Sequence, residues 1–345
     1  LPAMLKATYA AYHKDPFFNP IPKLVYAIHN ISYQGRFPED KWPILSLPRS
    51  YYTYDFEFYG QINLTKSAIH LADAITTVSD TYAREIQTTD FGFGLQETLQ
   101  ARKEDLYGIL NGVDYQQWSP ETDPYTYGIH YSADDLSGKR RIKSKLRAEY
   151  QLPDSDDLPL IGMTTRFVEQ KGIDLITECA EKILQLDTQM IVLGSGEPRY
   201  HDFFEWLRRS YPDRVGIYIG FNNELAHRIE AGADIFLMPS LFEPCGLNQI
   251  YSLKYGTLPI VRLTGGLADT IEDGVNGFTF FDFTVHYFFD AAQRAIEVYR
   301  KHPDRWKQLM ITGMGQDFSW EKSAEKYLAV YNQVLGKKTY RSDPT

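Results

Sequence analysis

The sequence has few cysteines and no long apolar run. Two cysteines, Cys179 and Cys245, are too few for a disulfide framework and indicate a reducing compartment. No apolar stretch is long enough to span a bilayer, so we expect no membrane partner. The eight histidines show no metal-ligand spacing, and we therefore predict no protein metal site.

Positive charge is also scarce. Lys and Arg number 36 against 45 Asp and Glu, and the net charge of −9 argues against a nucleic-acid partner, whose binding depends on clustered cations. Aromatic residues are plentiful at 14%, with 25 Tyr; stacking on sugars would use some, although core packing accounts for most aromatics. A length of 345 residues suggests two domains.

Short apolar runs alternate with helical segments, which predicts an α/β fold with a doubly wound parallel sheet in the second half. Strands are expected at 23–28, 74–78, 105–110, 160–165, 190–194, 215–220, 234–240 and 258–262. Helices are expected at 1–14, 62–71, 81–87, 139–150, 173–186, 200–210, 224–232, 286–299 and after Ser319. Residues 32–61 show no clean period and are expected to form a long aromatic loop.

A polar, turn-rich change of character over 115–158 sets the expected domain boundary. We predict a first domain at 1–150 and a second at 151–320. The helix and tail at 321–345 are expected to cross back to the first domain.

The stretch Pro239–Ile271 contains two junctions where a loop enters a helix. Glu243-Pro244-Cys245-Gly246 forms the first, and Thr264-Gly265-Gly266 forms the second. Backbone N–H groups at such junctions are unpaired within the helix, so together they suit an anion or sugar hydroxyls.

Two cations precede this stretch in the chain. Arg166 and Lys171 follow a strand and could clamp a diphosphate; the alternative is a solvated basic pair at a helix start. Glu243 is either a solvated carboxylate or a functional one. His29 ends a strand, where ligands bind in such sheets, but a core histidine is equally compatible with its position. Cys245 is interpreted as a small buried group rather than a nucleophile.

A Gly-x-Gly sequence at the end of the strand at 190–194 could be the start of a dinucleotide-binding glycine motif. Gly194-Ser195-Gly196 has Arg199 where the third glycine would stand. We therefore expect no NAD cofactor.

Six segments together resemble the bacterial glycogen synthases and plant or cyanobacterial starch synthases. They are IHNISYQGRFP (28–38), KSAIHLADAITTVSDTYAREI (66–86), GILNGVDYQQWSP (108–120), TTRFVEQKGIDLI (164–176), SLFEPCGLNQIYSLKYGTLPIVRLTGGLADTI (240–271) and FSWEKSAEKYLAVY (318–331). They occur in the family's order from end to end.

The resemblance implies a GT-B fold, in which two Rossmann-like domains face a cleft. It implies transfer of glucose from ADP-glucose to the non-reducing end of an α-1,4-glucan, with retention at the anomeric carbon and without a cofactor. Arg166 and Lys171 would hold the departing diphosphate, Glu243 would bind glucose hydroxyls, and His29 would lie near the reacting face. The resemblance assigns further substrate contacts to Asn111, Cys245, Gly246, Leu247, Thr264, Gly265 and Gly266, with Asn111 in the same domain as His29.

Two departures from related patterns matter. Many nucleotide-sugar transferases carry a second Glu eight residues after the first, where this chain has Tyr251, as glycogen and starch synthases do. The family's N-terminal Lys-x-Gly-Gly-Leu loop is absent, so we expect the first domain to be incomplete and this chain alone to be inactive. The alternatives are a non-catalytic glucan- or nucleotide-binding module and a UDP-glucose-dependent α-glucosyltransferase. Bacterial cytoplasm or plastid stroma is the expected location.

Overall fold

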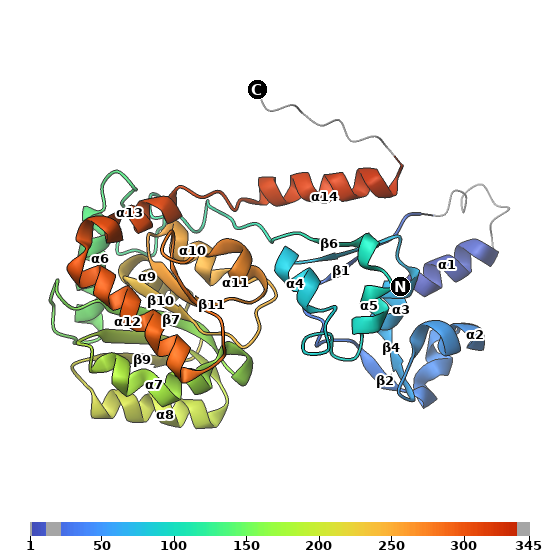
Figure 1. Ribbon diagram of the computed structural model, residues 1–345, viewed down its shortest axis with the longest axis horizontal. Helices are drawn as coiled ribbons and strands as arrows, with labels where there is room; N and C mark the ends of the chain where they lie inside the picture. Colours follow the sequence, from blue (N-terminus) through green and yellow to red (C-terminus); the bar gives the residue numbers. More distant parts are fainter. Residues whose placement is uncertain (1, 12–21, 337–345) are drawn as a thin grey trace. The chain divides into compact units, whose positions relative to one another are not determined.

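The computed structural model describes residues 2–11 and 22–336. The chain forms two compact units (Figure 1): unit 1 comprises residues 1–110 and 321–345, and unit 2 comprises Asn111–Trp320. The predicted boundary at residue 150 is therefore wrong. Helix α6 (Ser137–Glu149) belongs to unit 2, because its Lys139 and Arg147 side chains are buried there and donate hydrogen bonds to Ala231 O (3.0 Å) and Gln189 Oε1 (2.7 Å).

Unit 2 contains a six-stranded parallel sheet in the order β12-β11-β10-β7-β8-β9. The strands are β7 (Leu160–Phe167), β8 (Gln189–Gly196), β9 (Val215–Ile219), β10 (Ile235–Met238), β11 (Leu258–Arg262) and β12 (Phe278–Phe280). Alternate side chains enter opposite cores: Met190 and Val192 lie in one, and Ile191 and Leu193 in the other. Burial on both faces explains why the strands read as continuous apolar runs.

Helices cover both faces of this sheet, which confirms the doubly wound arrangement. One core receives α7 (Ile173–Leu184), α8 (Pro198–Ser210), α12 (Val285–Lys301) and α13 (Pro303–Met314). The other receives α6, α9 (Asn223–Gly232), α10 (Asn248–Lys254) and α11 (Gly265–Thr270). Strand β12 and helix α13 were not predicted, although Pro303 at the start of α13 is a recognisable signal of a helix beginning.

Unit 1 contains a three-stranded parallel sheet in the order β1-β5-β6, at the predicted strand positions. The strands are β1 (Val25–Ile28), β5 (Ala74–Thr77) and β6 (Leu106–Gly108). The helices are α1 (Pro2–Ala11), α3 (Leu64–Leu71), α4 (Asp80–Glu85), α5 (Gln96–Gln100), a 3₁₀ turn η4 (Lys103–Asp105) and α14 (Trp320–Val334). Ser79 caps α4 as predicted, because its Oγ accepts a hydrogen bond from Tyr82 N (3.1 Å). The rest of the predicted N-terminal helix (1 and 12–14) and the tail 337–345 lie outside the described residues.

The prediction of a long loop at 32–61 is wrong. This segment contains an antiparallel sheet of β2 (Arg36–Pro38), β4 (Gln61–Asn63) and β3 (Glu57–Phe58), with helical turns η2 (Glu39–Leu45), α2 (Arg49–Tyr51) and η3 (Tyr52–Phe56). Trp42 lies at the centre, with its ring 5.3 Å from Tyr52 and 5.1 Å from Phe56. These elements are too short for a period to show, and aromatic burial holds them together.

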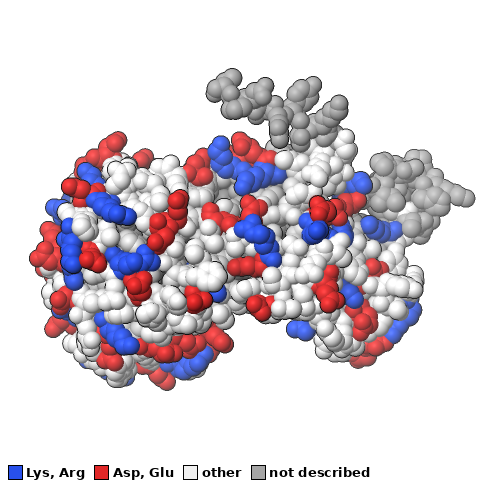
Figure 2. Space-filling view, viewed as in Figure 1, with Lys and Arg blue, Asp and Glu red and all other residues white. Residues whose placement is uncertain are grey.

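Charge is mixed over the surface seen in Figure 2, where acidic and basic side chains alternate on both units. None of the described helices combines the length and the apolar character needed to cross a membrane.

Candidate functional site

The carboxyl ends of β7 and β10 bring Lys171 and Glu243 together across 72 residues of sequence. Lys171 ends a 3₁₀ turn, η5 (Glu169–Lys171), after β7, and Glu243 lies in the loop after β10. Lys171 Nζ lies 2.5 Å from Glu243 Oε2, and Ser240 Oγ donates to the same oxygen at 3.1 Å. The Glu243 side chain is 7% exposed and that of Lys171 is 18% exposed, so Glu243 is not a solvated carboxylate.

The loop after β10 is bound to the loop after β7 through its backbone. Leu241 N donates to Gln170 O at 2.9 Å, and Gln170 Nε2 donates to Phe242 O at 3.3 Å. At Gly172 a Cβ atom would lie 1.9 Å from Pro239 O, and φ is +71°, so only glycine permits this approach. These contacts position Glu243 relative to Lys171.

The second predicted junction also packs against the Glu243 loop. A Cβ atom at Gly265 would lie 1.9 Å from Glu243 O, and one at Gly266 would lie 2.1 Å from Cys245 O. The Gly266 N–H donates to Glu243 O at 3.1 Å. This N–H therefore serves inside the loop, and contacts of Thr264, Gly265 and Gly266 with substrate stay predictions.

Both junctions lead into short helices. Gly246 (φ +72°) and Leu247 precede α10, which has 7 residues, and Thr264 precedes α11, which has 6. Helices this short contribute little dipole, so side-chain charge is the larger electrostatic factor at this edge of the sheet.

Cys245 is a buried residue of the loop between β10 and α10. Burial raises the pKa of its thiol to about 12, while a hydrogen bond from the Asn111 backbone N–H acts in the opposite direction. The thiol therefore stays protonated near neutral pH, in agreement with a packing role. Asn111 is the first residue of unit 2, which corrects its predicted assignment to the domain of His29.

Arg166 lies at a different part of the same sheet edge. It is exposed, its guanidinium forms no hydrogen bond or ion pair with any residue in the described part of the chain, and it lines a cavity of about 230 Å³. The cavity is formed by the ends of β7, β8 and β9 and the start of α9, and Phe221 at its wall is 90% exposed. Asn222 caps α9 by accepting from Leu225 N at 3.0 Å.

Phe221 was not predicted as a site residue, and Gly194 and Ser195, which line the same cavity, were given no role. The available signal was an aromatic residue directly after an apolar strand. Thr164 Oγ1, in the second half of β7, is buried and has no hydrogen-bond partner among the described residues.

Tyr251, at the position of the second Glu of other transferases, lies on α10. Its ring stacks on Trp118 with centroids 3.9 Å apart, and Trp118 stacks on His227 at 3.7 Å. Tyr251 therefore contributes aromatic packing behind the Glu243 loop.

His29 lies in unit 1, at the carboxyl end of β1, and is exposed. Its exposure removes the core-histidine alternative. Over residues 2–11 and 22–336, no three His, Cys, Asp or Glu side chains gather closely enough to hold a metal ion.

Two family models match the sequence. The starch synthase catalytic domain matches residues 1–101, and the group 1 glycosyl transferases match residues 145–309. Glycogen synthase 1 of Geobacter metallireducens is 44% identical over 345 residues, which cover 98% of this chain and 68% of that protein. The glycogen synthase of Koribacter versatilis is 45% identical, with 97% and 69% covered.

Solved structures agree with these relatives. The catalytic domain of starch synthase IV from Arabidopsis thaliana, bound to ADP and acarbose, has a TM-score of 0.89 at 34% identity and covers 97% of this chain and 71% of its own. A glycosyltransferase from Rickettsia africae has a TM-score of 0.62 at 16% identity over 96% of this chain and 74% of its own, which supports the fold alone. The chain is therefore a glycosyltransferase of the GT-B fold and belongs to the glycogen synthase and starch synthase family.

Proposed function

We propose that the protein containing this chain transfers glucose from ADP-glucose to the non-reducing end of an α-1,4-glucan, with retention at the anomeric carbon. The observation that carries the proposal is the nearly buried Lys171–Glu243 pair, which lies at the same edge of the sheet as the cavity that Arg166 and Phe221 line. The Arabidopsis thaliana starch synthase that this chain resembles binds ADP and acarbose, which supports a nucleotide sugar and a glucan as the two substrates.

The geometry supports a division of roles along the sheet edge. The adenine ring would pack on the exposed face of Phe221, because an exposed aromatic ring at a cavity wall offers a stacking surface. Arg166, whose guanidinium has no partner among the described residues, would bind the diphosphate. Lys171 would stabilise the charge that develops as ADP departs.

Glu243 would bind the glucose. Its carboxylate is held by Lys171 and Ser240, so its position is set before the sugar arrives. A carboxylate accepts hydrogen bonds from sugar hydroxyls, and a preorganised one loses little free energy on binding.

The order of bond changes follows from retention. The bond between the anomeric carbon and the ADP oxygen breaks, and an acceptor hydroxyl attacks from the same face. The departing phosphate oxygen accepts the hydroxyl proton, so no second carboxylate is required. Arg166 and Lys171 supply the positive charge for the diphosphate, and the proposal therefore includes no metal ion or other cofactor. We assign His29 of unit 1 to the reacting face.

The test uses the protein that contains this chain, with radiolabelled ADP-glucose or UDP-glucose and glycogen as acceptor. We expect label in elongated α-1,4 chains from ADP-glucose, and release of that label by an exo-acting α-glucosidase. Incorporation only from UDP-glucose would refute the donor assignment. No incorporation from either donor would refute the synthase activity and leave a binding function.

A further inference from the structure

The loop that carries Glu243, residues 240–246, follows β10, and β10 lies between β7 and β11 in the sheet. On the β7 side, the backbone and side chain of Gln170 hold Leu241 and Phe242. On the β11 side, the Gly266 N–H reaches this loop at Glu243 O. The position of the Glu243 side chain therefore depends on contacts from both neighbouring strands.

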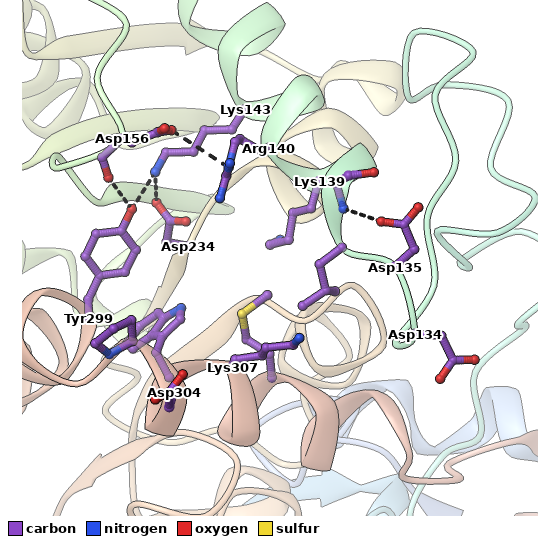
Figure 3. A pocket seen from close by; sticks show the side chains of 15 residues that line it. Asp134, Asp135, Lys139, Arg140, Lys143, Asp156, Asp234, Tyr299, Asp304 and Lys307 are labelled. Atoms are coloured by element: carbon purple, nitrogen blue, oxygen red, sulfur yellow. Dashed lines mark hydrogen bonds and ion pairs between the residues drawn. The ribbon is translucent and has the colours of Figure 1, made fainter.

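The amino end of β10 is fixed separately. Asp234, directly before the strand, accepts a hydrogen bond from Leu160 N at 2.7 Å, and Lys143 Nζ lies 2.6 Å from the same carboxylate oxygen. Lys143 Nζ also lies 2.8 Å from the Tyr299 hydroxyl. Figure 3 shows Lys143, Asp234 and Tyr299 turned toward one another at the wall of a cavity of about 560 Å³ between α6 and α13. The strand is anchored where it begins, so the freedom of the Glu243 loop is decided at the carboxyl end.

Arg262, the last residue of β11, supplies a further contact at that end. Its Nη1 donates to Leu241 O at 2.5 Å, and its Nε donates at 3.0 Å to Phe281 O, in the loop after β12. The guanidinium carbon lies 5.9 Å from the centre of the Phe283 ring, and the residue is half-buried. One side chain thus joins the loops that follow β10 and β12, across the strand between them.

This contact depends on the shape of a guanidinium. Its N–H donors lie in one rigid plane, so two of them can serve carbonyls on different loops at once, whereas a lysine ammonium is a point charge on a flexible stem. The positive charge strengthens each hydrogen bond. Leu241 is then held through both of its backbone groups, because its N–H donates to Gln170 O and its carbonyl accepts from Arg262.

We propose that Arg262 is a positioning residue for glucosyl transfer, because it fixes the backbone two residues before Glu243 and so sets where that carboxylate meets the glucose of the donor. The inference rests on the proposed function and deepens the role given there to Glu243. Arg262 acts through the loop and not on the diphosphate. A misplacement of about 1 Å can cost on the order of 100-fold in rate, so a contact this close to Glu243 is visible in kinetics.

The first test compares Arg262→Gln with Arg300→Gln in the protein that contains this chain. Arg300, on α12, also donates to two backbone carbonyls, Leu186 O at 2.6 Å and Asp187 O at 2.7 Å, so both variants lose one positive charge and the same kind of hydrogen bond. Arg262→Gln should lower kcat/KM for ADP-glucose at least ~10-fold, and Arg300→Gln should leave it within about twofold. Equal losses in the two variants would overturn the proposal.

ADP separates positioning from a direct effect of charge, because ADP lacks the glucose that Glu243 contacts. Arg262→Gln should leave the Kd of ADP, measured by calorimetry, within about twofold of the unchanged protein. Arg262→Lys should stay at least ~5-fold below the unchanged protein in kcat/KM, because an ammonium does not reproduce the planar pair of donors. A Kd of ADP that rises as much as kcat/KM falls, or full recovery in Arg262→Lys, would assign Arg262 to the charge of the diphosphate and overturn the proposal.

A double-variant cycle shows whether Arg262 acts through Glu243. In a Glu243→Ala background, Arg262→Gln should lower kcat/KM by less than about twofold further, because the carboxylate that it positions is gone. A further loss of ~10-fold would show that the two residues act independently and would overturn the proposal.

Amide hydrogen exchange reports the loop contact without activity. Arg262→Gln should speed exchange over residues 240–246, where the Leu241 N–H is hydrogen-bonded, and Arg300→Gln should not. Faster exchange there in a protein that transfers no glucose would refute the proposed function and leave the contact between Arg262 and the loop intact. Unchanged exchange over 240–246 in a protein that transfers glucose would overturn the inference about Arg262 and leave the proposed function intact.

Discussion

Lys171 and Glu243 allow the effects of charge on stability and on catalysis to be separated. Lys171→Met leaves the Glu243 carboxylate nearly buried without its cation. Unpairing a buried charge costs about 3–5 kcal/mol, and because Lys171 keeps 18% exposure we expect the lower end, about 3 kcal/mol of unfolding free energy. The double variant Lys171→Met/Glu243→Gln removes both charges at similar volume, so its stability should return to within about 1 kcal/mol of the unchanged protein.

Activity should not return with stability. The single variants Lys171→Met and Glu243→Gln should each lose at least ~100-fold in kcat/KM, equivalent to about 2.7 kcal/mol of transition-state stabilisation, because both residues are proposed to contact substrate. The double variant should stay equally slow. Urea unfolding gives the stabilities, and initial rates with ADP-glucose and glycogen give kcat/KM. A double variant that recovers both stability and rate would show that the pair is structural only and would remove both residues from the proposed mechanism.

Phe221→Ala should raise the KM for ADP-glucose about tenfold and leave the KM for glycogen nearly unchanged, because it removes a stacking surface. The control is Trp206→Ala, which removes an exposed aromatic side chain on α8. Equal KM values for ADP-glucose in the two variants would contradict the assignment of Phe221. Gly265→Ala should have a clearly lower Tm than Gly128→Ala. Both glycines have positive φ, but only the Cβ atom at position 265 would clash with backbone, because it would lie 1.9 Å from Glu243 O. Equal Tm values would contradict this packing. Burial raises the pKa of Glu230 to about 8 from 4.5, so the folded protein keeps a proton that the unfolded chain releases, and its stability should fall as pH rises between these values. Glu230→Gln should flatten that fall in urea unfolding, and an unchanged pH profile would count against it.

Lys139 provides an internal check on the last prediction. Burial lowers its pKa to about 7 from 10.5, so its contribution to stability rises with pH between these values, opposite in sign to that of Glu230. The two windows overlap only between about 7 and 8. The Glu230→Gln effect should therefore be clearest below pH 7.

The sequence by itself determined the class of fold, the family and the candidate charges. Parallel strands buried on both faces leave continuous apolar runs, and a glycine-containing junction such as Thr264-Gly265-Gly266 marks the start of a helix. Features of this kind depend on residues close together in the chain, so they can be recognised in the sequence. The positions of Arg166, Lys171 and Glu243 followed from them.

Only the tertiary structure decided which of these residues meet. Lys171 and Glu243 pair across 72 residues because β7 and β10 are neighbours in the sheet, which no local pattern reveals. The charged helix α6 is buried in unit 2 because Lys139 and Arg147 find acceptors on distant segments. Arg166 and Phe221 share a cavity, and the cavity between α6 and α13 joins residues far apart in the chain. Periodicity reports which face of an element is buried, but partner choice is set by packing and hydrogen-bond satisfaction across the whole fold.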